Sequence, residues 1–188
     1  MSSTFVEIVK QGCSFLERAG FRLTTSEPSQ VQYESDNSYV IVNWDSRSGE
    51  LNAFVGLLPR SGKAGDEYSL ADVMGFAGVA VSDRKPAQVL ECGRLGPFVE
   101  SLAENLHRYG QAALKGDRMF FRSLEKFRSS ESARFMREMN LRQLRSVAEK
   151  AWRDRQYGRV VDLYSSVESE LSKAERLKLQ YARQHRVG

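Results

Sequence analysis

The first 20 residues carry apolar side chains at the three- and four-residue steps of a helix. These residues are Phe5, Ile8, Val9, Cys13 and Leu16. Their spacing predicts a helix over residues 4–19. Thr4 and Glu7 have the spacing of a capping box, which satisfies backbone N–H groups where a helix begins. Gly20 is expected to end the helix, because glycine readily adopts the backbone conformation of a C-terminal cap.

The apolar period then changes to two, which is typical of strands. Four alternating segments, separated by polar turns, lie at residues 21–25, 31–35, 39–45 and 51–58. Short turns of this kind connect neighbouring antiparallel strands, so the segments predict a four-stranded meander. Leu51, Ala53, Val55 and Leu57 share one face of the last strand, and we expect that face to pack on the first helix.

After a polar loop, Ser69 and Asp72 have the spacing to cap a short helix that ends near Gly78. Residues 81–94 are interpreted as a linker, with a short strand at 88–92. Beyond Gly93 apolar residues recur only at helical spacing, in five segments at residues 95–114, 119–127, 131–155, 157–171 and 172–181.

The predicted fold class is therefore α+β. An N-terminal helix, a four-stranded antiparallel meander and a short helix form a domain over residues 1–80, and an all-α region covers residues 95–188. Composition agrees with a folded chain, since 41% of the residues are hydrophobic and 28% are charged.

Charge is distributed unevenly between the two halves. Residues 1–90 hold 8 Lys/Arg and 11 Asp/Glu, a net charge of −3, whereas residues 91–188 hold 20 and 13, a net charge of +7. The halves are expected to present surfaces to different partners, or an acidic and a basic face that meet.

Several features predict a cytoplasmic protein that has no membrane partner. No run of about 18 apolar residues is present, which excludes a transmembrane helix. The first residues lack the basic and apolar segments of a signal peptide. Cys13 and Cys92 are too few for a disulfide framework and are expected to be buried thiols in a reducing compartment.

The sequence contains no recognisable catalytic or metal-binding motif. His107 and His185 have no second His or Cys at zinc-ligand spacing, and neither cysteine has a histidine nearby in sequence. The loop at residues 60–66 lacks the residue order of a phosphate-binding loop. We therefore predict no catalytic residue and no cofactor. An enzyme whose site is assembled from distant residues stays as a third interpretation.

The segment at about residues 141–171 resembles a tetratricopeptide helical hairpin. Its first helix would carry the inward-facing set Leu144, Val147, Ala148 and Ala151, and its second the set Tyr157, Val160, Val161, Tyr164 and Val167. Ser172 stands where that family usually has proline. Any antiparallel helical hairpin would account for the same spacing.

The N-terminal block is similar to small α/β domains of uncharacterised bacterial proteins, some of which resemble toxin-immunity proteins. The similarity lies in the lengths and pattern of the segments 31–36, 39–42, 51–58 and 68–73. It implies that the chain binds a partner protein, and no functional residue is carried over from it.

The candidate partner-binding residues are aromatic or basic: Trp44, Arg47, Arg118, Arg122, Arg145, Arg153 and Tyr157. Interspersed acidic residues favour a solvated amphipathic face or an arginine-rich protein interface over a nucleic-acid surface. If Val40, Val42 and Trp44 point away from the first helix, we expect the helical tail to cover them. The sequence thus favours a non-enzymatic bacterial protein-binding protein, immunity-like or an adaptor. The alternative is a nucleic-acid-associated regulator that uses the basic tail. The oligomeric state is left open.

Overall fold

The computed structural model describes residues 4–59 and 67–185 and confirms the α+β fold class. The chain forms two compact units, residues 1–128 and residues 129–188, and we describe each by itself. Helix α6 (Arg118–Arg153) begins in the first unit and ends in the second. None of the helices in the described ranges is both long and apolar enough to cross a membrane.

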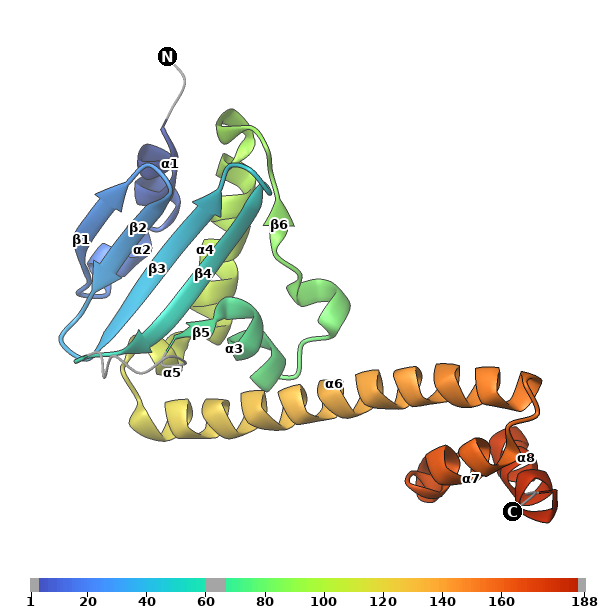
Figure 1. Cartoon of the computed structure of the whole chain (residues 1–188). Helices are drawn as coiled ribbons and strands as arrows, with labels where there is room; N and C mark the ends of the chain where they lie inside the picture. Colours follow the sequence, from blue (N-terminus) through green and yellow to red (C-terminus); the bar gives the residue numbers. More distant parts are fainter. Residues whose placement is uncertain (1–3, 60–66, 186–188) are drawn as a thin grey trace. The chain divides into compact units, whose positions relative to one another are not determined.

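The first unit contains the predicted meander (Figure 1). Its strands are β1 (Arg22–Glu27), β2 (Gln30–Glu34), β3 (Ser38–Asp45) and β4 (Glu50–Leu57), each antiparallel to the next. Two short strands, β5 (Tyr68–Ser69) and β6 (Ala87–Gln88), both pair with β4 and extend the sheet. The strand predicted at 88–92 is therefore shorter and begins one residue earlier.

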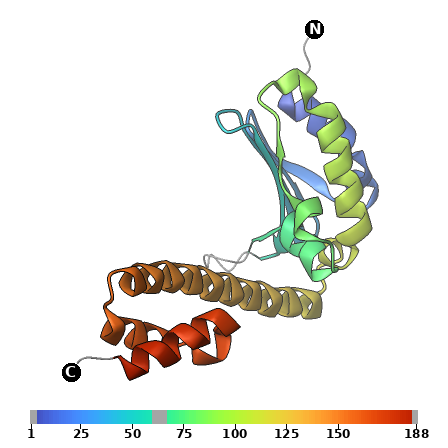
Figure 2. The ribbon, with the colours of Figure 1, turned by 90° about the vertical axis from the view of Figure 1, so that its right-hand side faces the viewer.

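Helices cover one face of this sheet, as Figure 2 shows. The predicted first helix is divided at Cys13 into α1 (Phe5–Gly12), which begins with the expected capping box, and α2 (Ser14–Arg18). The short helix α3 (Leu70–Phe76) has the predicted capping box of Ser69 and Asp72. The longest helix on this face is α4 (Gly96–Tyr109).

The core lies between the sheet and these helices. Val40, Val42 and Trp44 point into it, and the apolar stripe of α4, which consists of Leu95, Val99, Leu102 and Leu106, packs there as well. Strand β4 packs on helices that include α3 and α4, whereas the first helix packs mainly on α4 and β2. The inward face of β4 and the first helix belong to the same core, and α4 is the longest helix that covers this face.

The unit boundary differs from the predicted one at residues 80–95. Buried residues of α4, α5 (Gln111–Leu114) and the start of α6 belong to the same core as the sheet. The stripe on α4 buries its apolar surface against the sheet, since burial of apolar area is the main stabilising term. Residues 81–94 are likewise part of the first unit, because Trp44 donates its indole N–H to the Val89 carbonyl at 2.8 Å.

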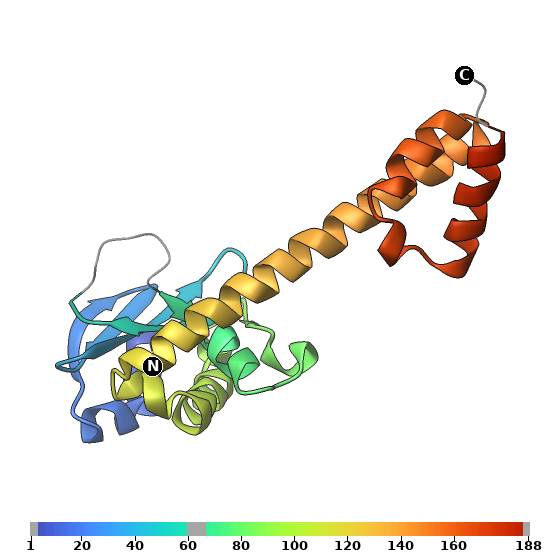
Figure 3. The ribbon, with the colours of Figure 1, turned by 90° about the horizontal axis from the view of Figure 1, so that it is seen from below.

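The second unit consists of the later part of α6 with α7 (Tyr157–Ser165) and α8 (Lys173–Gln184) (Figure 3). The helices predicted at 119–127 and 131–155 are one continuous helix, because no Gly or Pro lies between them to end it. The helix predicted at 157–171 ends at Ser165, and the capping box of Ser172 and Glu175 begins α8 as expected.

The core of the second unit is small and separate. Its buried members are Ala148, Ala151, Val160, Val161, Tyr164, Leu171, Leu179 and Ala182. The inward-facing residues predicted for the helical hairpin are thus in this core or packed against it, apart from Val147, which is half-buried. The resemblance to tetratricopeptide repeats stays a prediction.

Candidate functional site

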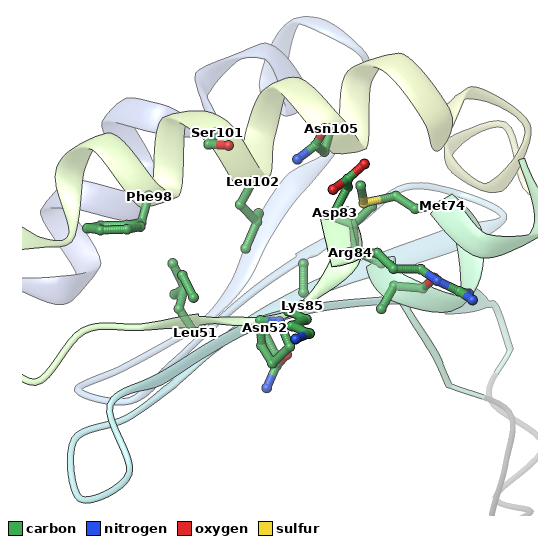
Figure 4. Close-up of a pocket in the computed structure, with 15 residues that line it drawn as sticks. Leu51, Asn52, Met74, Asp83, Arg84, Lys85, Phe98, Ser101, Leu102 and Asn105 are labelled. Carbon is green, nitrogen blue, oxygen red and sulfur yellow. The ribbon is translucent and has the colours of Figure 1, made fainter. Parts of the chain in front are cut away.

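A small pocket opens between β4, α3, α4 and residues 83–87 of the first unit (Figure 4). Its volume is about 110 Å³, which is well below the several hundred Å³ of a typical small-molecule site. Asp83, Arg84 and Lys85 supply its charged groups, while Ser101 and Asn105 on α4 supply neutral polar ones. These groups do not include a nucleophile paired with a base.

Arg84 has a structural role at this pocket. Its Nη1 donates to the Ala71 carbonyl at 3.4 Å, and its guanidinium occupies the space that a side chain at Gly75 would fill. A glycine in α3 is therefore required for Arg84 to reach the helix backbone. This geometry explains the arginine without a ligand.

The thiols and histidines are not arranged for catalysis. Cys13 is fully buried, and burial raises the pKa of its thiol to about 12, so the nucleophilic thiolate is scarce at neutral pH. Cys92 is half-buried rather than buried as expected. His107 contacts the edge of Phe15, and His185 stacks on Tyr181. Within residues 4–59 and 67–185, no three His, Cys, Asp or Glu side chains are grouped to hold a metal ion.

Two predicted arginines come together on the first turns of α6. Arg118 and Arg122 are exposed and line a surface pocket with Tyr68, Phe121 and Glu125. Arg47 lies apart from them in the turn after β3, where its backbone N–H donates to Asp45. Trp44 is 9% exposed and belongs to the core, so it is not available to a partner.

Ion pairs involve every glutamate of the second unit. Arg137 pairs with Glu170 at 2.8 Å, Arg145 with Glu175 at 2.9 Å, and Arg183 with Glu168 at 2.8 Å. The remaining pairs join Lys178 to Glu149, and Arg134 to Glu131 and Glu138. Three of these pairs connect α6 or α8 to residues 168–175. Predicted site residue Arg145 is therefore engaged within the unit.

Four cations gather where α6 ends and α7 begins: Lys150, Arg153, Arg155 and Arg159. Within the described part of the second unit these side chains form no ion pair, because its glutamates are engaged elsewhere. We call these four residues the basic corner. The second unit holds 13 Lys/Arg and 8 Asp/Glu, a net charge of +5, and the basic corner carries four of its cations.

A pocket of about 450 Å³ opens at the basic corner. Lys150, Arg153 and Arg159 line it, and Asp154 is the one carboxylate among its described lining residues. Its volume lies within the usual range of ligand sites. Three cations against one carboxylate give the pocket an attraction for anions.

The turn that forms the basic corner has an unusual residue. The Gln156 N–H donates to the Ala151 carbonyl at 2.8 Å, and the Arg155 N–H donates to the Trp152 carbonyl at 3.1 Å. This pattern is a Schellman motif, in which glycine is preferred at the position of Arg155 because the backbone is left-handed there. Arg155 has φ 56°, and it is the one non-glycine residue with a positive φ in the described chain.

Three other helix ends provide a comparison within the same molecule. Helices α2, α3 and α5 end in the same pair of hydrogen bonds, and glycine occupies the left-handed position each time, at Gly20, Gly78 and Gly116. A left-handed backbone costs a residue with a Cβ about 1–2 kcal/mol. Strain of this kind is concentrated at functional positions, which points to a use for the Arg155 side chain.

Aromatic rings flank the same turn. Trp152, Tyr157 and Tyr181 contact one another edge to face, with ring centroids 5.4–5.6 Å apart. His185 stacks on Tyr181 at 3.9 Å. Tyr181 is 43% exposed and its neighbour one turn earlier, Leu177, is 60% exposed. We call these five residues the aromatic surface.

Exposed apolar residues also occur on the middle of α6, at Phe135, Met136 and Met139. The arginines beside them, Arg134 and Arg137, are ion-paired. The cations directly beside this apolar segment are therefore already engaged, unlike those of the basic corner.

Of the seven predicted site residues, the structure brings only Arg153 and Tyr157 to the basic corner and the aromatic surface. The other seven residues were missed: Lys150, Trp152, Arg155, Arg159, Leu177, Tyr181 and His185. The four-residue spacing of Leu177, Tyr181 and His185 was a signal in the sequence, because it places them on one helix face. The absence of a glycine at residues 154–156, between α6 and α7, was a second signal in the sequence.

Neither the protein-family models, the curated proteins nor the solved structures contain a match to this chain.

Replacing Arg155 with glycine is expected to stabilise the protein by about 1 kcal/mol, because glycine removes the cost of the left-handed backbone. The measurement is urea unfolding at equilibrium. Arg155→Ala is the matched control, since it removes the same charge but keeps a Cβ, and it should not stabilise. Equal effects of the two substitutions would show that the charge, and not the backbone, determines stability here.

The ion pair between Arg137 and Glu170 should make stability depend on pH. Hydrogen bonding from Arg137 lowers the pKa of Glu170 in the folded protein, so the stabilisation is present above the unfolded pKa, about 4.3, and is lost as pH falls through the folded value. Arg137→Gln should therefore lower the thermal midpoint at pH 7, and this difference should shrink towards pH 3.

Arg142→Gln provides the control for this measurement. Arg142 lies on the same helix and forms no ion pair within the described residues. Its substitution should shift the midpoint by a similar small amount at each pH. A difference for Arg137→Gln that stays constant from pH 7 to pH 3 would contradict the assigned role of Glu170.

Proposed function

We propose that this chain is a non-enzymatic protein-binding protein, of the adaptor or immunity-like kind, and that it binds its partner through the second unit. The observation that carries the proposal is the aromatic surface beside the basic corner. Tyrosine, tryptophan and arginine are the residues that contribute most often to the energy of protein interfaces.

The exposure of this surface supports the proposal. Leu177 and Tyr181 are large apolar or aromatic side chains that remain exposed, although the same helix buries Leu179 and Ala182 in the core of the unit. Contiguous exposed apolar groups with polar neighbours are typical of protein interaction sites. The rings are also held by mutual contacts, so little side-chain entropy would be lost when a partner binds.

A nucleic-acid-associated regulator is the second candidate function. Unpaired arginines beside aromatic rings are also the combination that binds phosphate backbones and stacked bases. Arg153 and Arg155 beside Trp152 and Tyr157 support it. A reducing, cytoplasmic location is consistent with either function, since Cys13 is a buried free thiol.

Leu177→Glu should reduce partner capture by about tenfold, because it places a charge in an apolar contact. The experiment is affinity purification of the tagged full chain from its native cells after nuclease treatment, with quantitative mass spectrometry. Leu177 is 60% exposed, so the substitution should leave the thermal midpoint unchanged.

The matched control is Gln180→Glu, which adds the same charge at an exposed position of the same helix. It should capture as much partner as the unmodified chain. A co-purifying protein whose amount is unaffected by Leu177→Glu would count against the aromatic surface, and recovery of only nuclease-sensitive material would favour the second candidate.

A further inference from the structure

We infer that the pocket at the basic corner binds an anionic side chain, a carboxylate or a phosphate group, on a peptide segment of the partner. This inference rests on the proposed function and deepens it, because it names the chemistry that the partner must present. Three observations carry it: the charge of the pocket, its shape and the strained turn.

The charge argument concerns which cations are left to act on a ligand. The arginines at positions 134, 137, 145 and 183 already have glutamate partners, so a ligand would have to replace those pairs. Lys150, Arg153 and Arg159 have no such partner within the described residues and line one pocket. An anion there gains charge-assisted hydrogen bonds without breaking existing ones.

The shape argument distinguishes an anionic side chain from a nucleic-acid backbone. A strand of nucleic acid requires cations distributed along a track that follows successive phosphates. Along α6 towards the first unit, Arg145, Arg137 and Arg134 are each paired with a glutamate. Arg142 is the one cation between residues 134 and 149 that has no ion pair within the described residues, so a single unpaired arginine does not continue such a track. The three pocket cations instead converge on one concave site, which suits a single compact anionic group.

The turn argument explains why an arginine is kept in a strained position. The same hydrogen-bonded turn has glycine at three other helix ends, and only Arg155 replaces it. Arg155 carries a fourth positive charge at the same turn, and it is exposed to solvent. The strain is accounted for if this charge attracts the anionic segment towards the pocket.

The aromatic surface completes the site. Tyr157 lies between Arg155 and Arg159 of the basic corner in the chain, and it contacts Trp152 and Tyr181. A bound segment with an acidic residue next to an apolar one could therefore place the acid in the pocket and the apolar side chain on the rings. The inferred partner motif is an acidic residue adjacent to an apolar one.

The test is fluorescence anisotropy with the full chain at low salt and four rhodamine-labelled probes. These probes are hexaglutamate, hexaglutamine, a hexapeptide with one phosphoserine among glycines, and a twelve-residue oligothymidylate. Hexaglutamate or the phosphoserine peptide should bind, and hexaglutamine should not. The tighter of the two anionic peptides identifies carboxylate or phosphate as the preferred group.

Four substitutions then locate the binding. Arg153→Glu and Arg159→Glu should each weaken the anionic peptide by about tenfold. Arg176→Glu is the matched control, an exposed arginine of α8 that has no ion pair within the described residues and does not line the pocket, and it should have little effect. Asp154→Asn removes the carboxylate of the pocket and should strengthen binding by about threefold, a gain that a folding defect cannot imitate.

Three results would overturn the inference. The first is the absence of anionic-peptide binding above that of hexaglutamine. The second is an equal loss of binding in Arg176→Glu and Arg153→Glu. The third is tighter binding of the oligothymidylate, weakened by every charge reversal, which would assign the surface to nucleic acid. Partner capture that depends on Leu177 would still support protein binding in the first case, so the two failures can be distinguished.

Discussion

The turn between α6 and α7 is the constraint on which the proposed site depends. Its two hydrogen bonds end a 36-residue helix, and the chain turns there and continues as α7. The turn thereby places Lys150 and Arg153 near Arg159 around one pocket, and it brings Trp152 into contact with Tyr157. Its left-handed position holds Arg155 where the molecule elsewhere uses glycine. Geometry, charge and strain thus coincide at one place.

The distribution of glutamates gives this turn its charge. All six glutamates of the second unit pair with cations, and three of the pairs hold residues 168–175 against α6 or α8. The fold therefore uses several of its glutamates to join helices, and within residues 129–185 the cations of the turn form no ion pair. Exposed pairs of this kind contribute little individually, so their main effect here is on which charges remain available to a partner.

The meander and the three capping boxes were predictable because they depend on local spacing, as at Ser69 with Asp72 and Ser172 with Glu175. The unit boundary was not, because only the tertiary structure shows that the stripe of α4 packs on β4. Trp44 was misassigned for the same reason, since its burial requires Val89, 45 residues away. In the site, Arg153 and Tyr157 were predicted, whereas its pocket depends on a turn that local spacing does not specify.

The most direct test of the central claim is a heteronuclear NMR titration of the ¹⁵N-labelled full chain with the anionic peptide that binds more tightly. The account predicts that the largest amide shifts lie in residues 150–160, with smaller ones at residues 177–185 of α8. It also predicts that the Asp154→Asn variant shows the same pattern of amide shifts, and that these shifts saturate at a lower peptide concentration. Shifts concentrated at residues 134–145, or in the first unit around Arg118 and Arg122, would contradict the assignment of the site to the basic corner.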